Sequence, residues 1–187
     1  MSDDAKHRRF ELLVLPHLDA ALNLARWLTH NDQDAQDVVQ EACVRAIRFV
    51  HGFRGDNARP WLLQIVRNTC FAWLKENRPA EILLCDDSDE ILNGVAAPVT
   101  DEPAAVAMHN ADRLQINRAI AALSAVYREV LVLRELNDLP YKDIAQIVDI
   151  PVGTVMSRLA RARSLLKQAL LAGGPQNAAH VPAVAAE

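Results

Sequence analysis

Four cations near the carboxyl end are the residues whose chemistry is easiest to interpret. Residues 151–167, PVGTVMSRLARARSLLK, hold these cations and no acid. The apolar residues of the segment recur at helical spacing, which predicts one helix with a buried stripe and a basic outer surface. Such a surface suits phosphate oxygens and base edges, so it indicates nucleic-acid binding. The expected buried stripe is Val155, Leu159, Ala162 and Leu166, and the cations are Arg158, Arg161, Arg163 and Lys167.

The residues before this helix predict a helix-turn-helix motif. Ser124 can cap one helix, and a break at residues 137–138 precedes Pro140, which the first turn of a helix tolerates. The short helix YKDIAQIV then leads through the turn DI into the basic helix. Asp149 takes a turn position where glycine is more usual, and Asp tolerates the left-handed backbone region better than most residues.

The amino-terminal half of the second helix enters the major groove in helix-turn-helix proteins. There an Arg can pair with a guanine edge, and a hydroxyl can bond a base or a phosphate. Arg163 and Lys167 lie farther along and suit phosphates, although a solvated helix end explains Lys167 equally well. Arg158 could also bridge to an acid of its own domain. The outward-facing residues of the first half are Thr154, Ser157, Arg158 and Arg161.

The first 78 residues predict a lobe of three helices. The first helix is expected from about Arg8 to Thr29, and Asp32 can cap the second, DAQDVVQEACVRAIRFV. Acids at i, i+3 and i+7 form a stripe beside the apolar face of the second helix. The stripe is either a solvated face whose acids suit the helix dipole or a docking surface for a basic partner. Its members are Asp34, Asp37 and Glu41.

A glycine-rich loop, HGFRGDNARP, leads into the third helix, WLLQIVRNTCFAWLKENR. Trp61 and Trp73 lie close to basic residues and could stack on unpaired bases. Aromatic residues at helical spacing belong more often to a core, and this interpretation is favoured for Trp61. For Trp73 the two interpretations are evenly balanced.

Charge divides the chain into an acidic middle and two flanking segments. The net charge of -4 results from +1 in residues 1–78, -8 in residues 79–112 and +3 in residues 113–187. The middle segment also concentrates Pro and Gly, which predicts a flexible linker. Residues 172–187 have no amphipathic period and predict a disordered tail.

Composition favours an all-α protein that needs no cofactor. Half of the residues are apolar but only 5% are aromatic, and alternating β-branched patterns are scarce. No apolar run approaches the ~18 residues of a membrane span, and the amino terminus lacks the order of a signal peptide. Cys43, Cys70 and Cys85 lack metal-type spacing and are expected to be reduced thiols of a cytoplasmic protein. No phosphate loop, metal-ligand cluster or nucleophile–base pattern stands out, so we expect neither a metal site nor an enzyme.

Both lobes resemble one family, the extracytoplasmic-function class of bacterial RNA polymerase sigma factors. Residues 34–48 and 53–78 are similar to sigma region 2, and residues 123–167 are similar to region 4. The motif GTVMSRLARAR after a helix and a turn is fairly specific, and the order of the two lobes strengthens the resemblance. We therefore expect two small helical domains with a linker and a tail. The ranges are 8–78 for a region 2-like three-helix lobe, 79–112 for the acidic linker, 113–171 for a region 4-like four-helix lobe and 172–187 for the tail.

The resemblance also implies partners: core RNA polymerase, promoter DNA and a separate anti-sigma protein. The acidic stripe would dock on the coiled coil of the polymerase β′ subunit, through Asp34, Asp37, Gln40 and Glu41. The loop and third helix would hold the minus-ten element through Phe53, Arg54, Gly55, Asp56, Asn57, Arg67, Asn68 and Lys75. Region 4 would touch the β flap and read the minus-thirty-five element through Thr154, Met156, Ser157, Arg158, Ala160, Arg161 and Arg163. The acidic linker would thread the nucleic-acid channel of the polymerase.

Departures from the family pattern concern the promoter sequence rather than the class. Met156 stands where relatives often have a basic residue, Ala160 where many have a larger ring, and Pro140 where Ser or Thr is frequent. The loop before Trp61 is about one residue shorter than in many relatives. Two other classes of protein remain as alternatives. One is a helix-turn-helix regulator that does not associate with core polymerase, and the other is a helical adaptor, which would leave the basic helix unexplained.

Overall fold

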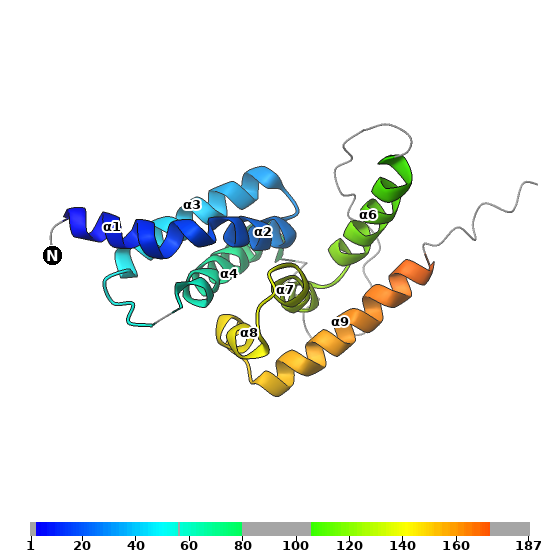
Figure 1. Cartoon of the computed structure of the whole chain (residues 1–187). Helices are drawn as coiled ribbons and strands as arrows, with labels where there is room; N and C mark the ends of the chain where they lie inside the picture. Colours follow the sequence, from blue (N-terminus) through cyan, green and yellow to red (C-terminus); the bar gives the residue numbers. More distant parts are fainter. Residues whose placement is uncertain (1–2, 56, 80–105, 173–187) are drawn as a thin grey trace, which may run out of the picture.

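The computed structural model describes residues 3–55, 57–79 and 106–172, and the regular elements in these ranges are all helical (Figure 1). The all-α fold class is therefore confirmed. The amino-terminal lobe contains α1 (Asp3–Val14), the short 3₁₀ helix η1 (Leu15–His17), α2 (Leu18–Thr29), α3 (Asp32–Phe49) and α4 (Ala58–Asn77). The carboxy-terminal lobe contains α6 (Val106–Ala121), α7 (Ala125–Leu131), the π-helical turn η2 (Val132–Leu136), α8 (Tyr141–Val148) and α9 (Val152–Ala172).

Pro16 divides the first expected helix in two. Because proline has no amide hydrogen and its ring clashes with the preceding turn, the chain passes through η1 before α2 begins. The prediction of one continuous helix up to Thr29 is wrong for this reason. His30 then ends α2 in the left-handed backbone region, with a φ of 57°.

An asparagine, and not the expected aspartate, caps α3. The Asn31 side-chain oxygen accepts hydrogen bonds from the amides of Gln33 and Asp34, at 2.8 and 3.1 Å. Asp32 is the first residue of α3 and pairs instead with Arg26, at 2.8 Å. The prediction that Asp32 is the cap is therefore wrong by one residue.

Asn57 begins α4 in the same way. Its side chain accepts a hydrogen bond from the amide of Arg59, at 3.1 Å, so α4 starts at Ala58 and not at Trp61. This earlier start places the first turn of α4 directly after the glycine-rich loop.

The carboxy-terminal lobe contains the predicted helix-turn-helix motif in α8 and α9. Asp149 ends α8 with φ 59° and ψ 50°, which confirms the left-handed turn. Pro140 is the N-cap of α8 and lies one residue before its first turn. Ser124 occupies the N-cap position of α7, but its side chain makes no capping hydrogen bond. α6 begins at Val106, within the range expected to be linker.

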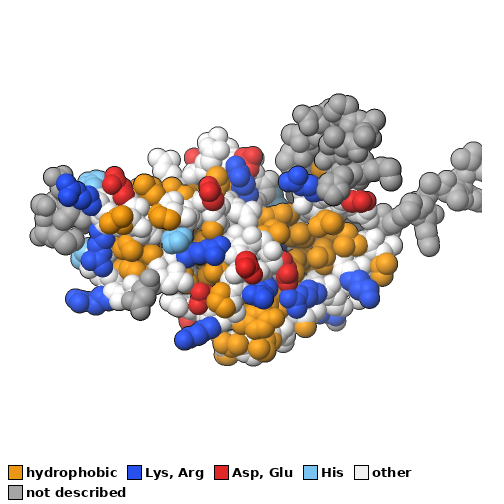
Figure 2. Space-filling view, in the orientation of Figure 1, with side chains coloured by type: hydrophobic (Ala, Val, Ile, Leu, Met, Phe, Trp, Pro, Cys, Tyr) orange, Lys and Arg blue, Asp and Glu red, His pale blue; other side chains and the backbone are white. Residues whose placement is uncertain are grey.

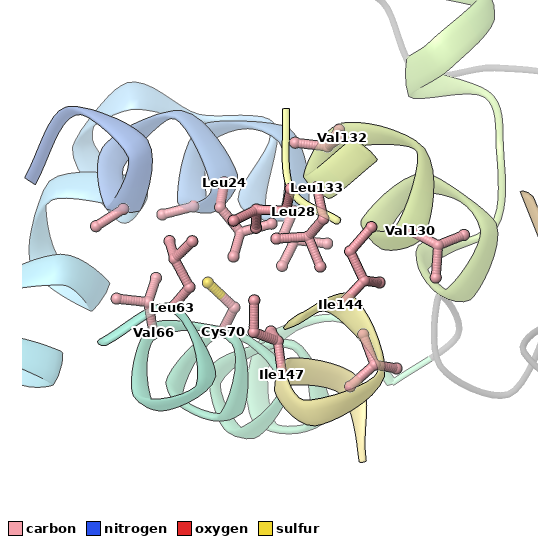
Figure 3. Close-up of a cluster of buried hydrophobic side chains, with 14 of the residues drawn as sticks. Leu24, Leu28, Leu63, Val66, Cys70, Val130, Val132, Leu133, Ile144 and Ile147 are labelled. Carbon is pink, nitrogen blue, oxygen red and sulfur yellow. The ribbon is translucent and has the colours of Figure 1, made fainter. Parts of the chain in front are cut away.

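One hydrophobic core continues from one lobe into the other (Figure 3). α2, α3 and α4 pack together in the first lobe, α7, α8 and α9 in the second, and α4 lies against α8 where the lobes meet. The completely buried side chains at this junction include Leu28, Leu63 and Cys70 from the first lobe and Leu133, Ile144 and Ile147 from the second. Burying one leucine or isoleucine side chain contributes about 1.5–3 kcal/mol, so the junction is a substantial interface. The sequence did not predict this interface.

Candidate nucleic-acid interface

The first three turns of α9 carry the residues expected to meet duplex DNA. The predicted apolar stripe anchors α9 to α7 and α8, because Val155, Leu159 and Ala162 are buried and Leu166 is half-buried. In the space-filling view, Lys and Arg side chains follow α9 (Figure 2). The outward-facing residues of this half are Val152, Gly153, Met156, Ser157 and Ala160, all exposed, with Thr154 half-buried.

Two of the cations of α9 pair with acids of their own lobe. Arg158 Nη1 lies 3.9 Å from an oxygen of Glu129, which confirms the bridge to an acid expected for this residue. Arg163 donates two hydrogen bonds to Glu135, at 3.1 and 2.6 Å, and this partner raises the pKa of the guanidinium. A phosphate would have to compete with Glu135 for Arg163, whereas Lys167 is exposed near the far end of the helix.

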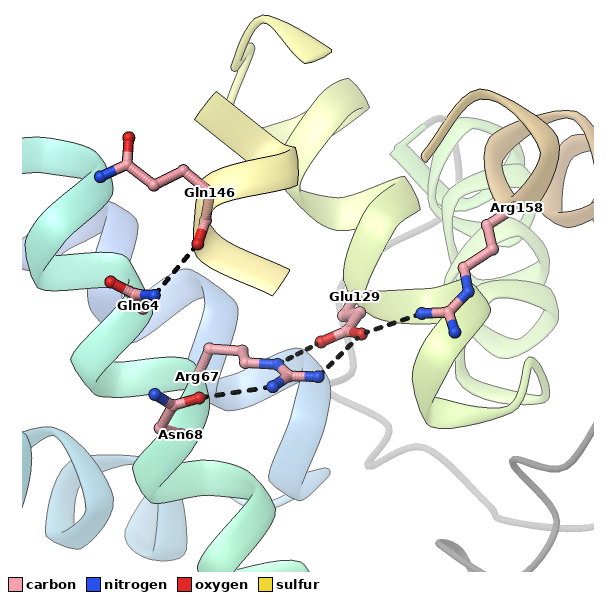
Figure 4. Close-up of polar contacts among 6 residues, drawn as sticks. All are labelled: Gln64, Arg67, Asn68, Glu129, Gln146 and Arg158. Atoms are coloured by element: carbon pink, nitrogen blue, oxygen red, sulfur yellow. Dashed lines mark hydrogen bonds and ion pairs between the residues drawn. The ribbon is translucent and has the colours of Figure 1, made fainter. Parts of the chain in front are cut away.

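Glu129 on α7 is the centre of an ion-pair network between the lobes (Figure 4). Its carboxylate is completely buried and accepts hydrogen bonds from Arg67 on α4, at 2.8 and 3.2 Å. Arg67 also donates to the Asn68 side chain, at 3.3 Å, and lies 4.2 Å from the ring centroid of Phe71. Burial raises the pKa of Glu129, while the hydrogen bond from Arg67 and the charges of Arg67 and Arg158 oppose this shift.

This network brings together two residues that the sequence assigned to different promoter elements. Arg67 was expected to act on the minus-ten element and Arg158 on the minus-thirty-five element, yet both face the same carboxylate. A buried carboxylate needs such partners, because an unpaired charge in a low-dielectric interior is unfavourable.

Further polar contacts connect α4 and α2 to the second lobe. Gln64 donates to the Gln146 carbonyl, at 3.1 Å (Figure 4), and Arg59 donates to the Asn137 carbonyl, at 2.6 Å. The buried Asn137 side chain accepts from Asn23, at 2.9 Å. α4 therefore presents its polar side to the second lobe over much of its length.

Sequence analysis did not identify Glu129, Asn137 or Gln146 as site residues. Glu129 did leave a signal, since it is the sole acid in the largely apolar residues 125–134. A lone acid in an apolar helix must find a partner when it is buried. No residue pattern indicates that this partner lies 62 positions earlier in the chain.

The loop between α3 and α4 is held by an aromatic contact. The Phe53 and Trp61 rings lie 5.0 Å apart, and Arg9 donates a hydrogen bond to the Phe53 carbonyl. A Cβ at Gly55 would approach the Phe53 ring to 3.0 Å, so glycine at this position lets the ring fold over the loop. Of the other expected minus-ten residues, Arg54 is exposed, Asn57 caps α4, Asn68 and Lys75 are exposed on α4, and Asp56 lies outside the described residues.

Trp61 and Trp73 are both half-buried against the core. The Arg78 guanidinium lies 5.6 Å from the ring centroid of Trp73. The expected core role is confirmed for Trp61, whereas the stacking interpretation of Trp73 stays a prediction.

The acidic stripe runs along α3 beside the face that buries Val38, Ala42 and Ala46. Glu41 pairs with Arg45, at 2.8 Å, and Gln33 donates to Asp37, at 3.4 Å. These contacts are exposed and local, so they leave the stripe accessible. Its members are Asp37, Gln40 and Glu41, all exposed, and the half-buried Asp34.

The described ranges contain neither a membrane-spanning helix nor a cluster of metal-binding side chains. None of the helices there is long and apolar enough to cross a membrane. Nor do three or more His, Cys, Asp or Glu residues in those ranges come together as a metal site would require.

Comparison with known proteins places both lobes in one family. The model described as Sigma-70 region 2 matches residues 13–79, and the model described as Sigma-70, region 4 matches residues 113–166. The chain is 36% identical over 167 residues to the RNA polymerase sigma-H factor of Pseudomonas aeruginosa, covering 87% of this chain and 86% of that protein. It is 34% identical over 164 residues to the ECF RNA polymerase sigma-E factor of Escherichia coli K12, covering 85% of each.

Two solved structures of similar fold are complexes, one of them of a sigma factor. The sigma factor RpoE of Bartonella quintana, in complex with the anti-sigma factor NepR, superposes with a TM-score of 0.63 at 27% identity, over 92% of this chain and 99% of that one. CnrH, in complex with the cytosolic domain of CnrY, superposes with a TM-score of 0.62 at 25% identity, over 89% of this chain and 90% of that one.

Proposed function

The chain belongs to the extracytoplasmic-function class of RNA polymerase sigma factors, and from this premise we propose that it binds core RNA polymerase and directs initiation at a specific set of promoters. The observation that carries the proposal is that an acidic face on α3 and a basic face on α9 are both exposed on one chain. An acidic face suits a basic protein segment, and a cationic helix suits DNA. A protein that holds a polymerase and a duplex together needs both surfaces.

The outer face of α3 is the proposed docking surface for core polymerase. We assign this contact to the coiled coil of the β′ subunit. The local pairs of Glu41 and Asp37 are exposed, so a basic partner can replace them with little loss, because exposed ion pairs contribute ~0–1 kcal/mol. The docking residues are Asp34, Asp37, Gln40 and Glu41.

The loop before α4 and the exposed side of α4 are the proposed contacts for the minus-ten element. The packed ring of Phe53 would move from Trp61 to accept an unpaired base, since both surfaces offer aromatic stacking. Arg67 is held by Glu129 in this arrangement, so region 2 must separate from region 4 before Arg67 can reach a DNA strand. The remaining residues assigned to this element are Arg54, Gly55, Asp56, Asn57, Asn68 and Lys75.

α9 is the proposed reading helix for the minus-thirty-five element, and region 4 also contacts the β flap. Its first half is exposed even while the lobes are packed together, so duplex binding by α9 does not require the lobes to separate. Arg158 and Arg163 would act after release from Glu129 and Glu135. The other residues assigned to this element are Thr154, Met156, Ser157, Ala160 and Arg161.

A separate anti-sigma protein is the proposed regulator. Both similar solved structures carry a partner: RpoE is bound to the anti-sigma factor NepR, and CnrH is bound to the cytosolic domain of CnrY. Such a partner would keep this chain inactive by stabilising the packed lobes. We assign region 2 to residues 8–78 and region 4 to residues 113–171. Residues 79–112 are the proposed acidic linker in the polymerase channel, and residues 172–187 are the proposed tail.

Binding to core polymerase tests the proposal. Core enzyme from P. aeruginosa is titrated with the labelled full-length chain, and the sigma-H relative from the same organism serves as the positive control. Asp37→Lys with Glu41→Lys should weaken binding at least tenfold, because both reversals lie in the docking face. The matched control, Glu11→Lys with Asp19→Lys, makes the same change in net charge at exposed residues of α1 and α2 and should bind normally. Equal affinities of the two double variants would remove the proposed role of α3.

The alternative is a helix-turn-helix regulator that never associates with core polymerase. It would bind duplex DNA with the same α9 surface but would not compete with the sigma-H relative for core enzyme. The titration therefore separates the two functions directly.

A further inference from the structure

Three apolar residues form an exposed stripe on α9. Val152, Met156 and Ala160 follow one another at a spacing of four, which places them along one face of the helix. Val152 keeps 38% and Met156 keeps 50% of its surface exposed, so packing within the protein leaves this face accessible to another molecule. Figure 2 shows apolar side chains gathered on the surface where α8 turns into α9. The stripe begins with the first residue of α9 and lies in the half that enters the major groove.

The arginines beside the stripe are largely committed elsewhere. Arg158 faces the buried Glu129, and Arg163 donates to Glu135, so both guanidinium groups are paired with acids of the same lobe. The Ser157 hydroxyl also donates to the Thr154 carbonyl, at 3.0 Å. While these contacts hold, the apolar stripe stays exposed on the half of the helix that can face base edges.

Gly153 gives a second, independent indication that another molecule approaches closely. A Cβ at this position would meet nothing within 4 Å, so internal packing does not require glycine. Glycine is also a poorer helix former than alanine. Its use in the first turn of α9 is explained if an external surface lies against the backbone next to the stripe.

We propose that the stripe of Val152, Met156 and Ala160 contacts the 5-methyl groups of thymines, so that region 4 selects A·T pairs at defined positions of the minus-thirty-five element. The methyl group distinguishes thymine in the major groove, and small apolar side chains contact it there. The flexible thioether of Met156 can follow such an irregular apolar surface. Eight residues of helix span about 12 Å, so the stripe faces about three base pairs at about 3.4 Å each. This inference rests on the proposed function, because it names the bases that region 4 prefers.

The test uses the full-length chain and duplex DNA. Duplexes are first selected from a randomised pool, and each thymine of the selected site is then replaced, one at a time, by deoxyuridine. That change removes the methyl group and leaves every hydrogen-bonding group in place. Affinity should fall about fourfold at the thymines facing the stripe, which is the effect of burying one methyl-sized group. The loss should be the same at low and high salt, because a methyl contact releases no counterions.

A variant pair ties the effect to the stripe. For Met156→Ala, replacing one particular thymine by deoxyuridine should no longer change the affinity for the duplex. Leu171→Ala removes a side chain that is 72% exposed near the far end of the same helix and should keep the fourfold effect. An unchanged effect in Met156→Ala, or none in the unaltered protein, overturns the inference while leaving the proposed function in place. Failure to select any duplex also overturns the inference, whereas the proposed function is decided by the titration with core polymerase. If Met156→Ala weakens binding to core polymerase and not to DNA, the stripe is a protein contact and the inference is wrong.

Discussion

Replacing Arg67 with alanine should destabilise the protein far more than the same change at Arg45. In both pairs the arginine Nε lies 2.8 Å from a glutamate oxygen, and Arg67 adds a second hydrogen bond to Glu129, at 3.2 Å. The pairs also differ in burial, because Glu129 is 0% exposed whereas Glu41 is 51% exposed. The comparison therefore contrasts a buried arginine–glutamate network with an exposed arginine–glutamate pair.

The expected difference follows from the charge that each variant leaves behind. Removing one partner of a buried pair costs ~3–5 kcal/mol. Arg158 remains 3.9 Å from Glu129, and Arg67 itself is 19% exposed, so the low end of that range applies. Loss of the contact with the Phe71 ring adds about 0.5–1 kcal/mol. We expect a loss of about 3.5–4 kcal/mol for Arg67→Ala and about 0.3–0.5 kcal/mol for Arg45→Ala, whose pair is an exposed helical one.

Urea unfolding at pH 7, followed by circular dichroism, measures both losses. Adding Glu129→Gln to Arg67→Ala should recover part of the stability, because the second change removes the uncompensated buried charge. Losses within about 0.5 kcal/mol of each other for Arg67→Ala and Arg45→Ala would refute the buried network, since distant surface changes fall in that range. Additive effects of the Arg67 and Glu129 changes would refute their contact.

Three further outcomes follow from particular residues. Burial, together with the nearby charges of Arg128 and Arg78, lowers the pKa of His30 to about 3. The unfolded state therefore binds a proton below about pH 6.5 that the folded state does not. Stability should fall by about 1 kcal/mol between pH 7 and 5 once solvent screening is allowed for. Asparagine also tolerates the left-handed backbone, so His30→Asn should fold normally and flatten the pH dependence of the unfolding free energy in urea. An unchanged pH dependence would mean that other groups cause it. Gly153→Ala should raise the unfolding free energy by up to ~1 kcal/mol yet weaken duplex binding, and unaltered binding would show that no surface approaches this backbone. Arg161→Ala should reduce the ratio of specific to non-specific DNA affinity, whereas Lys167→Ala should lower both affinities alike and reduce the salt dependence of binding by about one ion. If Arg161→Ala instead weakened binding to the selected site and to non-specific DNA equally, Arg161 would be a phosphate contact.

Local chemistry in the sequence was sufficient to predict the helices and the helix-turn-helix motif. The period of Val155, Leu159 and Ala162 predicted the buried face of α9, and Asp149 was correctly expected to adopt the left-handed turn. The errors were also local. Pro16 breaks the first helix through its missing amide hydrogen, and Asn31 caps α3 one residue before the expected Asp32.

The packing of the two lobes could not be predicted, because no periodicity connects distant segments. Cys70 and Ile147 each belong to an amphipathic helix, and either could have filled the core of its own lobe alone. The same holds for Arg67, which looked like an exposed cation although its partner Glu129 lies in the other lobe. Assigning the polymerase and promoter contacts required the family resemblance, since an acidic stripe and a basic helix have many other uses.

Transcription by core polymerase tests the central claim most directly. P. aeruginosa core enzyme is supplied with a library of promoter fragments, with and without the full-length chain, and the transcript starts are sequenced. We expect new starts at a fixed distance from a shared pair of upstream elements. These starts should be lost with Asp37→Lys and Glu41→Lys but not with Glu11→Lys and Asp19→Lys. Unchanged transcript starts, from a chain that still binds its selected duplex and beside an active sigma-H control, would contradict the central claim.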